Sequence, residues 1–419
     1  MRYSFIDWFS KSFASRGLIN NALSQVKSSE ANLKKVKAQM ERTKTLFSQN
    51  KKDISYAKKI GLKNNFISRL ELDTKKLRGI ISSINSISKL KDPTDRILEQ
   101  WKRPNGLKIK KVSVPIGVIG VIYESRPNVT SDVSCLCFKS GNSVILKGGS
   151  EAYFTNKILS NLFRRSLKFH KIDPNFVQFV DMRSRKVVDH MLSKMTKYID
   201  IIIPRGGKSL VKKVQDTSKL PVIGHLEGLC HTYIDSSANL KMALKVVLNA
   251  KLRNTAICGA TETILLNDKL IKKFSRLLIT KLENNGCVVY TDNKIRKVYK
   301  GNSFLASEKD WMTEYLTSKI SIKSVKNVIE AINHINKYGT QHTDAIICKN
   351  KKTSKIFLKN VKSSIAMHNT STQFADGGEF GFGAEVGIST NNLPPRGPVG
   401  LGQLVSYKYE VFGSGQIRK

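Results

Sequence analysis

The chain has 419 residues and a formal net charge of +40, from 72 lysines and arginines against 32 aspartates and glutamates. This length exceeds what one hydrophobic core usually organises and predicts two domains, which the 40% of hydrophobic residues can fill. No apolar run reaches the roughly 18 residues that a membrane-spanning helix needs, so we expect a soluble protein.

The net charge would suit a protein that binds nucleic acid or an anionic surface. Its distribution argues against that interpretation, because the basic excess is spread almost evenly over the first 300 residues and forms no single stripe or tail. Lysine also occurs with many asparagines and isoleucines, so a compositional bias explains the charge at least as well. Nucleic-acid binding stays an alternative that no recognisable motif favours.

The six cysteines form no CxxC pair and show no regular spacing, which argues against a disulfide framework and favours a reducing cytoplasm. Cys135 and Cys137 form a CxC pair, and Cys230 is followed by His231. Neither has a second ligand pair at the usual spacing, so we expect no metal.

The first eighteen residues lack the continuous apolar segment of a targeting peptide, and we expect a leading helix or a ragged end there. Residues 22–47 and 66–90 carry apolar side chains every three or four positions, which predicts amphipathic helices. Pro93 ends this pattern, and β-branched residues and turn signals follow it.

From residue 142 the pattern alternates. It predicts strands at 142–149, 176–181, 198–204 and 221–226, and helices at 151–170, 184–194 and 207–217. Such alternation predicts a parallel sheet covered by helices, which binds its ligands at the carboxyl ends of the strands.

A second series predicts another α/β domain. It consists of a helix at 238–252, a strand at 262–266, a helix at 269–286 and a strand at 287–291. The tail from 369 is rich in glycine and ends in the alternating stretch VSYKYEVFG, which predicts an edge strand that reaches a partner subunit or another domain.

Two short motifs lie at predicted strand ends. IPRGGKSL ends like a phosphate-binding P-loop, but Ile202 stands where the first glycine is required. Gly206 and Gly207 could still let the backbone approach a phosphate or a nicotinamide, and a tight strand-to-helix turn explains them equally well. Lys147 closes its strand where an ammonium could reach a ribose or a phosphate, although most such lysines are simply solvated.

Two further residues are candidates for catalysis. Cys258 lies between a predicted helix and a predicted strand, where a thiolate could act as a nucleophile and a thiol could equally be a small apolar filler. Asn128 follows a proline in an expected loop, where its amide could donate to an oxyanion or merely start a turn.

Taken in order, several segments resemble the gamma-glutamyl phosphate reductases, or glutamate-5-semialdehyde dehydrogenases, of the aldehyde dehydrogenase superfamily. The similarity covers residues 20–419 and is carried by EQWKRPNGLKIKKVSVPIGVIGVIYESRPNVT, CFKSGNSVILKGGSEA, IPRGGKSLVKKV, LEGLCHTYID, ICGATETILL, YGTQHTDAII and DGGEFGFGAEVGIST with RGPVGL. Together these segments are highly specific, although no single one would be.

The resemblance implies an α/β, aldehyde-dehydrogenase-like fold with two Rossmann-like parallel-sheet domains and a small β oligomerisation arm. It implies N-terminal helices and an NADP-binding domain in residues 1–235, with an oligomerisation strand at 105–116. A catalytic domain at 236–372 and a glycine-rich active-site segment with a C-terminal arm at 373–419 would follow. It further implies a cytoplasmic homo-oligomer, a dimer or a tetramer, with glutamate 5-kinase as a candidate partner.

The resemblance also assigns roles to residues. Cys258 would be the nucleophile, and Asn128 would donate to the oxyanion beside the backbone N–H of Cys258. Lys147 would hold the adenosine ribose or its 2′-phosphate, and Glu314 would lie near the nicotinamide ribose. Arg126 and Arg396 are candidates to bind the substrate carboxylate.

The implied reaction is NADPH-dependent reduction of L-glutamyl 5-phosphate to L-glutamate 5-semialdehyde and phosphate through a Cys258 thioester, in proline biosynthesis. Glu227 lies near the position of the general base in hydrolytic relatives, and we expect it not to be essential. A hydrolytic, NAD(P)-dependent oxidation of a semialdehyde is the alternative within the superfamily.

Overall fold

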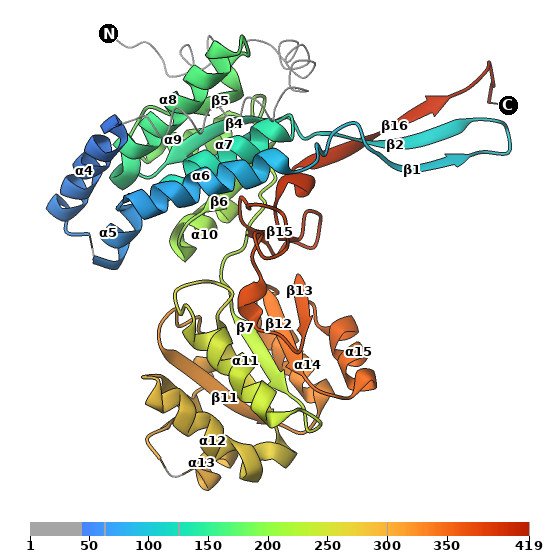
Figure 1. The fold of residues 1–419 in the computed structure, drawn as a ribbon. Helices are drawn as coiled ribbons and strands as arrows, with labels where there is room; N and C mark the ends of the chain where they lie inside the picture. Colours follow the sequence, from blue (N-terminus) through green and yellow to red (C-terminus); the bar gives the residue numbers. More distant parts are fainter. Residues whose placement is uncertain (1–43, 63, 125, 300, 419) are drawn as a thin grey trace. The chain divides into compact units, whose positions relative to one another are not determined.

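The computed structural model describes residues 44–62, 64–124, 126–299 and 301–418 (Figure 1). The expectation for the first eighteen residues and most of the helix predicted at 22–47 lie outside these described residues. The chain divides into two compact units. Unit 1 is the chain up to Gly224 with Gly381–Gly387 and everything from Val399 onward, and unit 2 is His225–Phe380 with Ile388–Pro398.

Unit 1 is built on a four-stranded parallel sheet in the order β5-β4-β3-β6. The strands are β3 (Val118–Tyr123), β4 (Ser143–Gly148), β5 (Val177–Phe179) and β6 (Ile201–Arg205). Every residue of the two central strands, β3 and β4, is buried, as expected when helices cover both faces of a sheet. The predicted parallel sheet is confirmed.

Helices pack on both faces of this sheet. One layer contains α4 (Lys44–Lys59), α5 (Asn64–Leu70), α6 (Thr74–Lys89), α7 (Pro127–Lys139) and α8 (Tyr153–Phe169), and the other contains α9 (Lys186–Lys194) and α10 (Lys208–Thr217). Strand β3 alternates between them: Ile119 and Val121 pack in the core of the first layer, whereas Val118 and Ile122 pack with the second. No helix in the described part of the chain has both the length and the apolar character needed to cross a bilayer.

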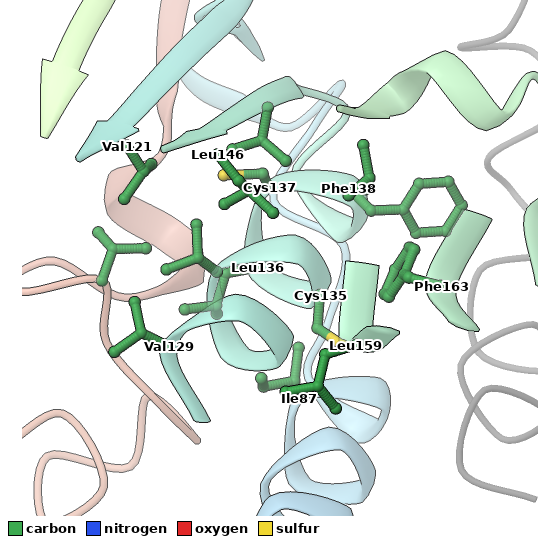
Figure 2. Packing of buried hydrophobic residues seen from close by; sticks show 14 of the residues in the cluster. Ile87, Val121, Val129, Cys135, Leu136, Cys137, Phe138, Leu146, Leu159 and Phe163 are labelled. Atoms are coloured by element: carbon green, nitrogen blue, oxygen red, sulfur yellow. The ribbon is translucent and has the colours of Figure 1, made fainter. Parts of the chain in front are cut away.

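The core of the first layer is packed around α7 (Figure 2). The ring of Phe138 meets the rings of Phe163 and Phe176 edge to face, with centroids 5.9 and 5.7 Å apart. Cys135 and Cys137 are fully buried in the same apolar cluster, and burial raises the pKa of both thiols. These two cysteines therefore serve as packing groups.

Unit 2 contains a seven-stranded parallel sheet in the order β10-β9-β11-β8-β7-β12-β13. The strands are β7 (Cys230–Ile234), β8 (Thr261–Asn267), β9 (Val288–Thr291), β10 (Phe304–Leu305), β11 (Lys319–Val325), β12 (Thr343–Ile347) and β13 (Ile365–His368). One face packs against α11 (Leu240–Leu252), α12 (Ile271–Asn284) and α13 (Asn293–Val298), and the other against α14 (Val328–Tyr338) and α15 (Lys351–Asn360). The predicted second α/β domain is confirmed.

An antiparallel sheet in unit 1, which we call the arm, is formed by β1 (Ile97–Lys102), β2 (Lys108–Pro115) and β16 (Val405–Phe412) in the order β1-β2-β16 (Figure 1). All of β1 is exposed. On β16 the side chains of Tyr407, Tyr409 and Val411 are 51%, 55% and 57% exposed. The edge strand predicted at the C-terminus therefore exists, and its apolar side chains face solvent within the single chain.

The structure differs from the sequence prediction where the chain leaves unit 1. The strand predicted at 221–226 is wrong, because only Val222 forms a bridge, to Ile202, before the chain continues into unit 2. Unit 2 begins at His225, earlier than the expected boundary after residue 235, because β7 is hydrogen-bonded into the unit 2 sheet. The expected segment 373–419 is likewise divided between the two units.

Candidate active site

Cys258 lies in the loop between α11 and β8. An ion pair joins the two ends of this loop, because Lys251 in the last turn of α11 donates to Glu262 in β8, and both side chains are fully buried. Gln373 also holds the loop, since its Oε1 accepts from Arg253 Nε at 2.8 Å. The backbone that carries the thiol is thus fixed at both ends.

The segment that leads into β7 packs directly against this loop. A Cβ atom at Gly228 would lie 2.2 Å from the carbonyl oxygen of Cys258 and 2.5 Å from its Cβ, so no larger residue fits there. The Gly228 N–H donates to Glu314 Oε1 at 2.9 Å, and Cys230 Sγ donates to the Cys258 carbonyl at 3.1 Å. A glycine is therefore required at position 228, because the backbone there passes very close to the backbone of Cys258.

Two imidazoles lie beside the thiol. The Sγ of Cys258 and one ring nitrogen each of His225 and His342 lie within 4.8 Å of one another, and the two rings meet edge to face at 4.9 Å. His342 is fully buried, whereas Cys258 and His225 are half-buried.

Each ring also has a contact outside the cluster. His225 Nδ1 lies 2.8 Å from the carbonyl oxygen of Ile388. His342 Nδ1 lies 2.9 Å from Thr343 Oγ1 and 3.6 Å from Cys230 Sγ. Each ring is therefore held by at least one contact of its own.

The two histidines decide the charge of the cysteine. Burial by itself would raise the pKa of the Cys258 thiol, but the charge of His342 and the hydrogen bond from His225 outweigh it, and the pKa lies well below its usual value. Burial raises the pKa of the other five cysteines, namely Cys135, Cys137, Cys230, Cys287 and Cys348. All six lie in the described part of the chain, and Cys258 alone among them is not fully buried. Cys258 therefore differs from the other five cysteines both in its exposure and in the direction of its pKa shift.

The candidate site lies at one edge of the unit 2 sheet. Gly228, Cys258, Glu314 and His342 come just before β7, β8, β11 and β12, and these four strands run parallel. The residues therefore gather at the amino ends of the strands, which agrees with the expected position of Cys258 between a predicted helix and a predicted strand.

Unit 1 follows the expected rule. Lys147 closes β4 and is 5% exposed, and its Nζ donates to the carbonyl oxygen of Gly148 at 2.7 Å. Burial lowers the pKa of this ammonium. Gly206 and Gly207 follow β6, where Glu124 accepts from the Gly207 N–H at 2.8 Å. A Cβ at Gly206 would lie 2.6 Å from that carboxylate, so a larger residue there would have to displace the Glu124 side chain.

The remaining candidates have their own partners. Asn128, in the first turn of α7, is exposed and donates from Nδ2 to Asp132 at 3.0 Å. Arg396 in unit 2 donates to Ser364 Oγ and Gln341 Oε1, both at 3.2 Å. Its guanidinium thus holds the residue next to His342, which is a structural contact that the sequence did not suggest. Glu227 is half-buried and adds negative charge near Glu314.

Sequence reasoning missed His225 and His342. They are separated from Cys258 by 33 and 84 positions, so no local spacing relates them. One signal was available: only seven histidines occur in this lysine-rich chain, and both residues lie in segments that carry the family resemblance or adjoin it.

Comparisons with known proteins relate the whole chain to one family. The profile of the aldehyde dehydrogenase family matches residues 18–292. The gamma-glutamyl phosphate reductase of Bartonella quintana (strain Toulouse) is 47% identical over 369 residues, which are 88% of this chain and 89% of that protein. The crystal structure of gamma-glutamyl phosphate reductase from Thermotoga maritima superposes with a TM-score of 0.92 at 38% identity, covering 96% of this chain and 98% of that one. An engineered glycolyl-CoA reductase with bound NADP+ is similar in fold alone, with a TM-score of 0.64 at 16% identity and coverage of 94% and 96%.

The contact at Gly228 yields a prediction. Gly228→Ala is expected to slow alkylation of Cys258 by iodoacetamide about tenfold or more, because the new methyl group must displace the loop that presents the thiol. Peptide mass spectrometry of the alkylated protein measures this rate. Gly402→Ala is the matched control, since a Cβ there meets nothing within 4 Å. Equal rates in the two variants would contradict the prediction.

Proposed function

This chain belongs to the aldehyde dehydrogenase family, within its gamma-glutamyl phosphate reductases, and from that premise we propose that it reduces L-glutamyl 5-phosphate to L-glutamate 5-semialdehyde and phosphate. This reaction would be the second step of L-proline biosynthesis. The observation that carries the proposal is the half-buried Cys258, whose pKa is held low between two imidazoles.

The proposed chemistry begins on the thiolate. Cys258 Sγ attacks the acyl carbon, the bond from that carbon to the phosphate oxygen breaks, and phosphate leaves a thioester on the enzyme. A nicotinamide cofactor, when bound, supplies the hydride that reduces this thioester to a thiohemiacetal. Collapse of the thiohemiacetal releases the aldehyde and returns Cys258 as a thiolate, for which its surroundings are already arranged.

Residues of unit 1 fit a nicotinamide dinucleotide, which we propose to be NADPH. The ammonium of Lys147 can donate three hydrogen bonds, and within the described residues it donates one, to Gly148. A ribose hydroxyl or a 2′-phosphate could accept the others. The Gly207 N–H, at the start of α10, already binds the carboxylate of Glu124, and a phosphate could take that place.

Two assignments complete the proposed site. Asn128, as the family resemblance implies, is the proposed oxyanion donor and would exchange its bond to Asp132 for one to the oxyanion. One such donor is worth roughly 2.7–4 kcal/mol in other enzymes. Glu314 would hold the nicotinamide ribose through the oxygen that does not bind Gly228. Burial raises the pKa of the Glu314 carboxyl group.

The test of the nucleophile is the reverse reaction. With glutamate semialdehyde and NADP+, the wild type is expected to form NADPH only when phosphate is present, and Cys258→Ala is expected to lose at least about a thousandfold in kcat. Absorbance of NADPH measures both rates. The control is Cys348→Ala, which removes a buried thiol without access to substrate. Turnover without phosphate would instead indicate hydrolytic oxidation, and salt-sensitive binding of polyanions without turnover would indicate the nucleic-acid alternative.

The reductase needs no base to activate water, since water would waste the thioester. Glu227→Gln is therefore expected to keep phosphate-dependent kcat within about threefold of the wild type. The same NADPH assay checks this expectation, with circular dichroism as the control for folding. A folded Glu227→Gln enzyme without turnover would contradict it.

We further propose that the arm joins two copies of the chain. The side chains of Tyr407, Tyr409 and Val411 lie on one face of β16, and Trp101 of β1 meets Tyr409 with ring centroids 6.1 Å apart. More than half of the surface of each of the three β16 side chains is exposed, which forms an apolar patch that a second copy would cover.

The double substitution Tyr409→Lys with Val411→Lys is expected to shift the protein to a smaller species, because it places two charges on the apolar face. Size-exclusion chromatography with light scattering measures the mass. Ser406→Lys is the control, since it adds a charge on the other face of the same strand. An unchanged mass in the double variant would refute association through the arm.

A further inference from the structure

His225 and His342 lie against the proposed nucleophile, and no proton-transfer step has yet been assigned to either of them. The sulfur of Cys258 and the two ring nitrogens form a cluster within 4.8 Å. They come from three separate segments, ahead of β7, β8 and β12. Only the parallel order of these strands in the unit 2 sheet brings them together.

The contact of His225 fixes which of its nitrogens can accept a proton. A backbone carbonyl oxygen only accepts hydrogen bonds, so Nδ1, at 2.8 Å from Ile388 O, carries the hydrogen. The neutral ring must then have its lone pair on Nε2. This is the arrangement of a base that can take a proton from the thiol and still keep its contact to Ile388.

The environment of His342 is different. The ring is fully buried, and its Nδ1 contacts the hydroxyl of Thr343 and the thiol of Cys230. Its Nε2 is buried and forms no hydrogen bond within the described part of the chain. Buried polar atoms normally have a hydrogen-bond partner. A thiolate on the neighbouring Cys258, which needs a second imidazole, explains why this nitrogen is buried without one.

We infer that His225 and His342 are positioning residues that keep Cys258 ionised by sharing one proton. The S–H bond of Cys258 breaks, and an N–H bond forms on His225 Nε2. A ring nitrogen of His342 is a second acceptor for the same proton. No electrons are exchanged in this step. The inference deepens the proposed function, because a thiolate of this kind is ready to attack the acyl phosphate and to be expelled again from the thiohemiacetal.

The other charged groups near the site oppose a thiolate, so the imidazolium is required. The carboxylates of Glu314 and Glu227 face the same region, and those of Asp344 and Glu262 act on the neighbouring thiol of Cys230. Among the residues that the structure describes, the two histidines lower the pKa of the Cys258 thiol. Removing either imidazole should therefore raise the thiol pKa toward its ordinary value of about 8.5.

The test measures the rate of Cys258 alkylation by iodoacetamide against pH in the full-length protein, with EDTA present so that no trace metal ion masks the thiol. A thiolate persists above the pKa of its thiol and is lost below it. The wild type should thus react at a nearly constant rate down to about pH 6, whereas His225→Gln and His342→Gln should react about tenfold or more slowly near pH 7 and recover above pH 9.

His368→Gln is the matched control. Its imidazole also lies 3.6 Å from a cysteine sulfur, that of Cys348, but it is not part of the Cys258 cluster. This variant should keep the profile of the wild type. If His342→Gln does not fold because the ring is buried, the half-buried His225 still provides the test.

A pH profile that neither substitution at the cluster changes would overturn the inference. So would a loss of rate that is equal at all pH values, because that outcome indicates a purely structural role. The result is separable from the proposed function: reductase activity with an ordinary thiol pKa would refute only the inference, and a low thiol pKa without reductase activity would refute only the proposed function.

Discussion

A thiolate in a half-buried loop is costly to maintain, because removing an anion from water must be offset by a nearby positive charge or by hydrogen bonds. In unit 2 two imidazoles meet this need for Cys258. Each ring is held by a separate contact, to Ile388 or to Thr343, so the cluster depends on segments far apart in the chain. This cluster is assembled by the loops, by Gly228 and by the strand order of the sheet.

The same requirement explains why the Cys258 loop is tied so closely. The buried pair of Lys251 and Glu262 fixes its two ends, and the close approach at Gly228 fixes its middle. A loop with several conformations would separate the sulfur from the imidazoles and leave the burial of the thiolate uncompensated. Rigid placement is therefore a condition for the charge state and not only for the geometry of attack.

The two units use opposite edges of their sheets. In unit 1 the candidate cofactor residues, Lys147 with Gly206 and Gly207, follow strands and lie at the carboxyl ends, as the rule for open α/β sheets predicts. In unit 2 the reactive residues precede strands and lie at the amino ends. The fold of each unit was predictable from alternating strand and helix patterns, and the same patterns placed Lys147 at the end of a strand and Cys258 ahead of one.

The sequence by itself determined both parallel sheets, the C-terminal strand and the candidacy of Cys258, because hydrophobic periodicity and short motifs are local properties of the chain. It did not identify His225 or His342, whose contacts with Cys258 span 33 and 84 positions, and it wrongly extended a strand through 221–226. Only the tertiary structure distinguishes the surroundings of Cys258 from those of the other five thiols. The pKa of a cysteine depends on the groups within a few ångströms of its sulfur, and sheet topology, not sequence distance, brings those groups together.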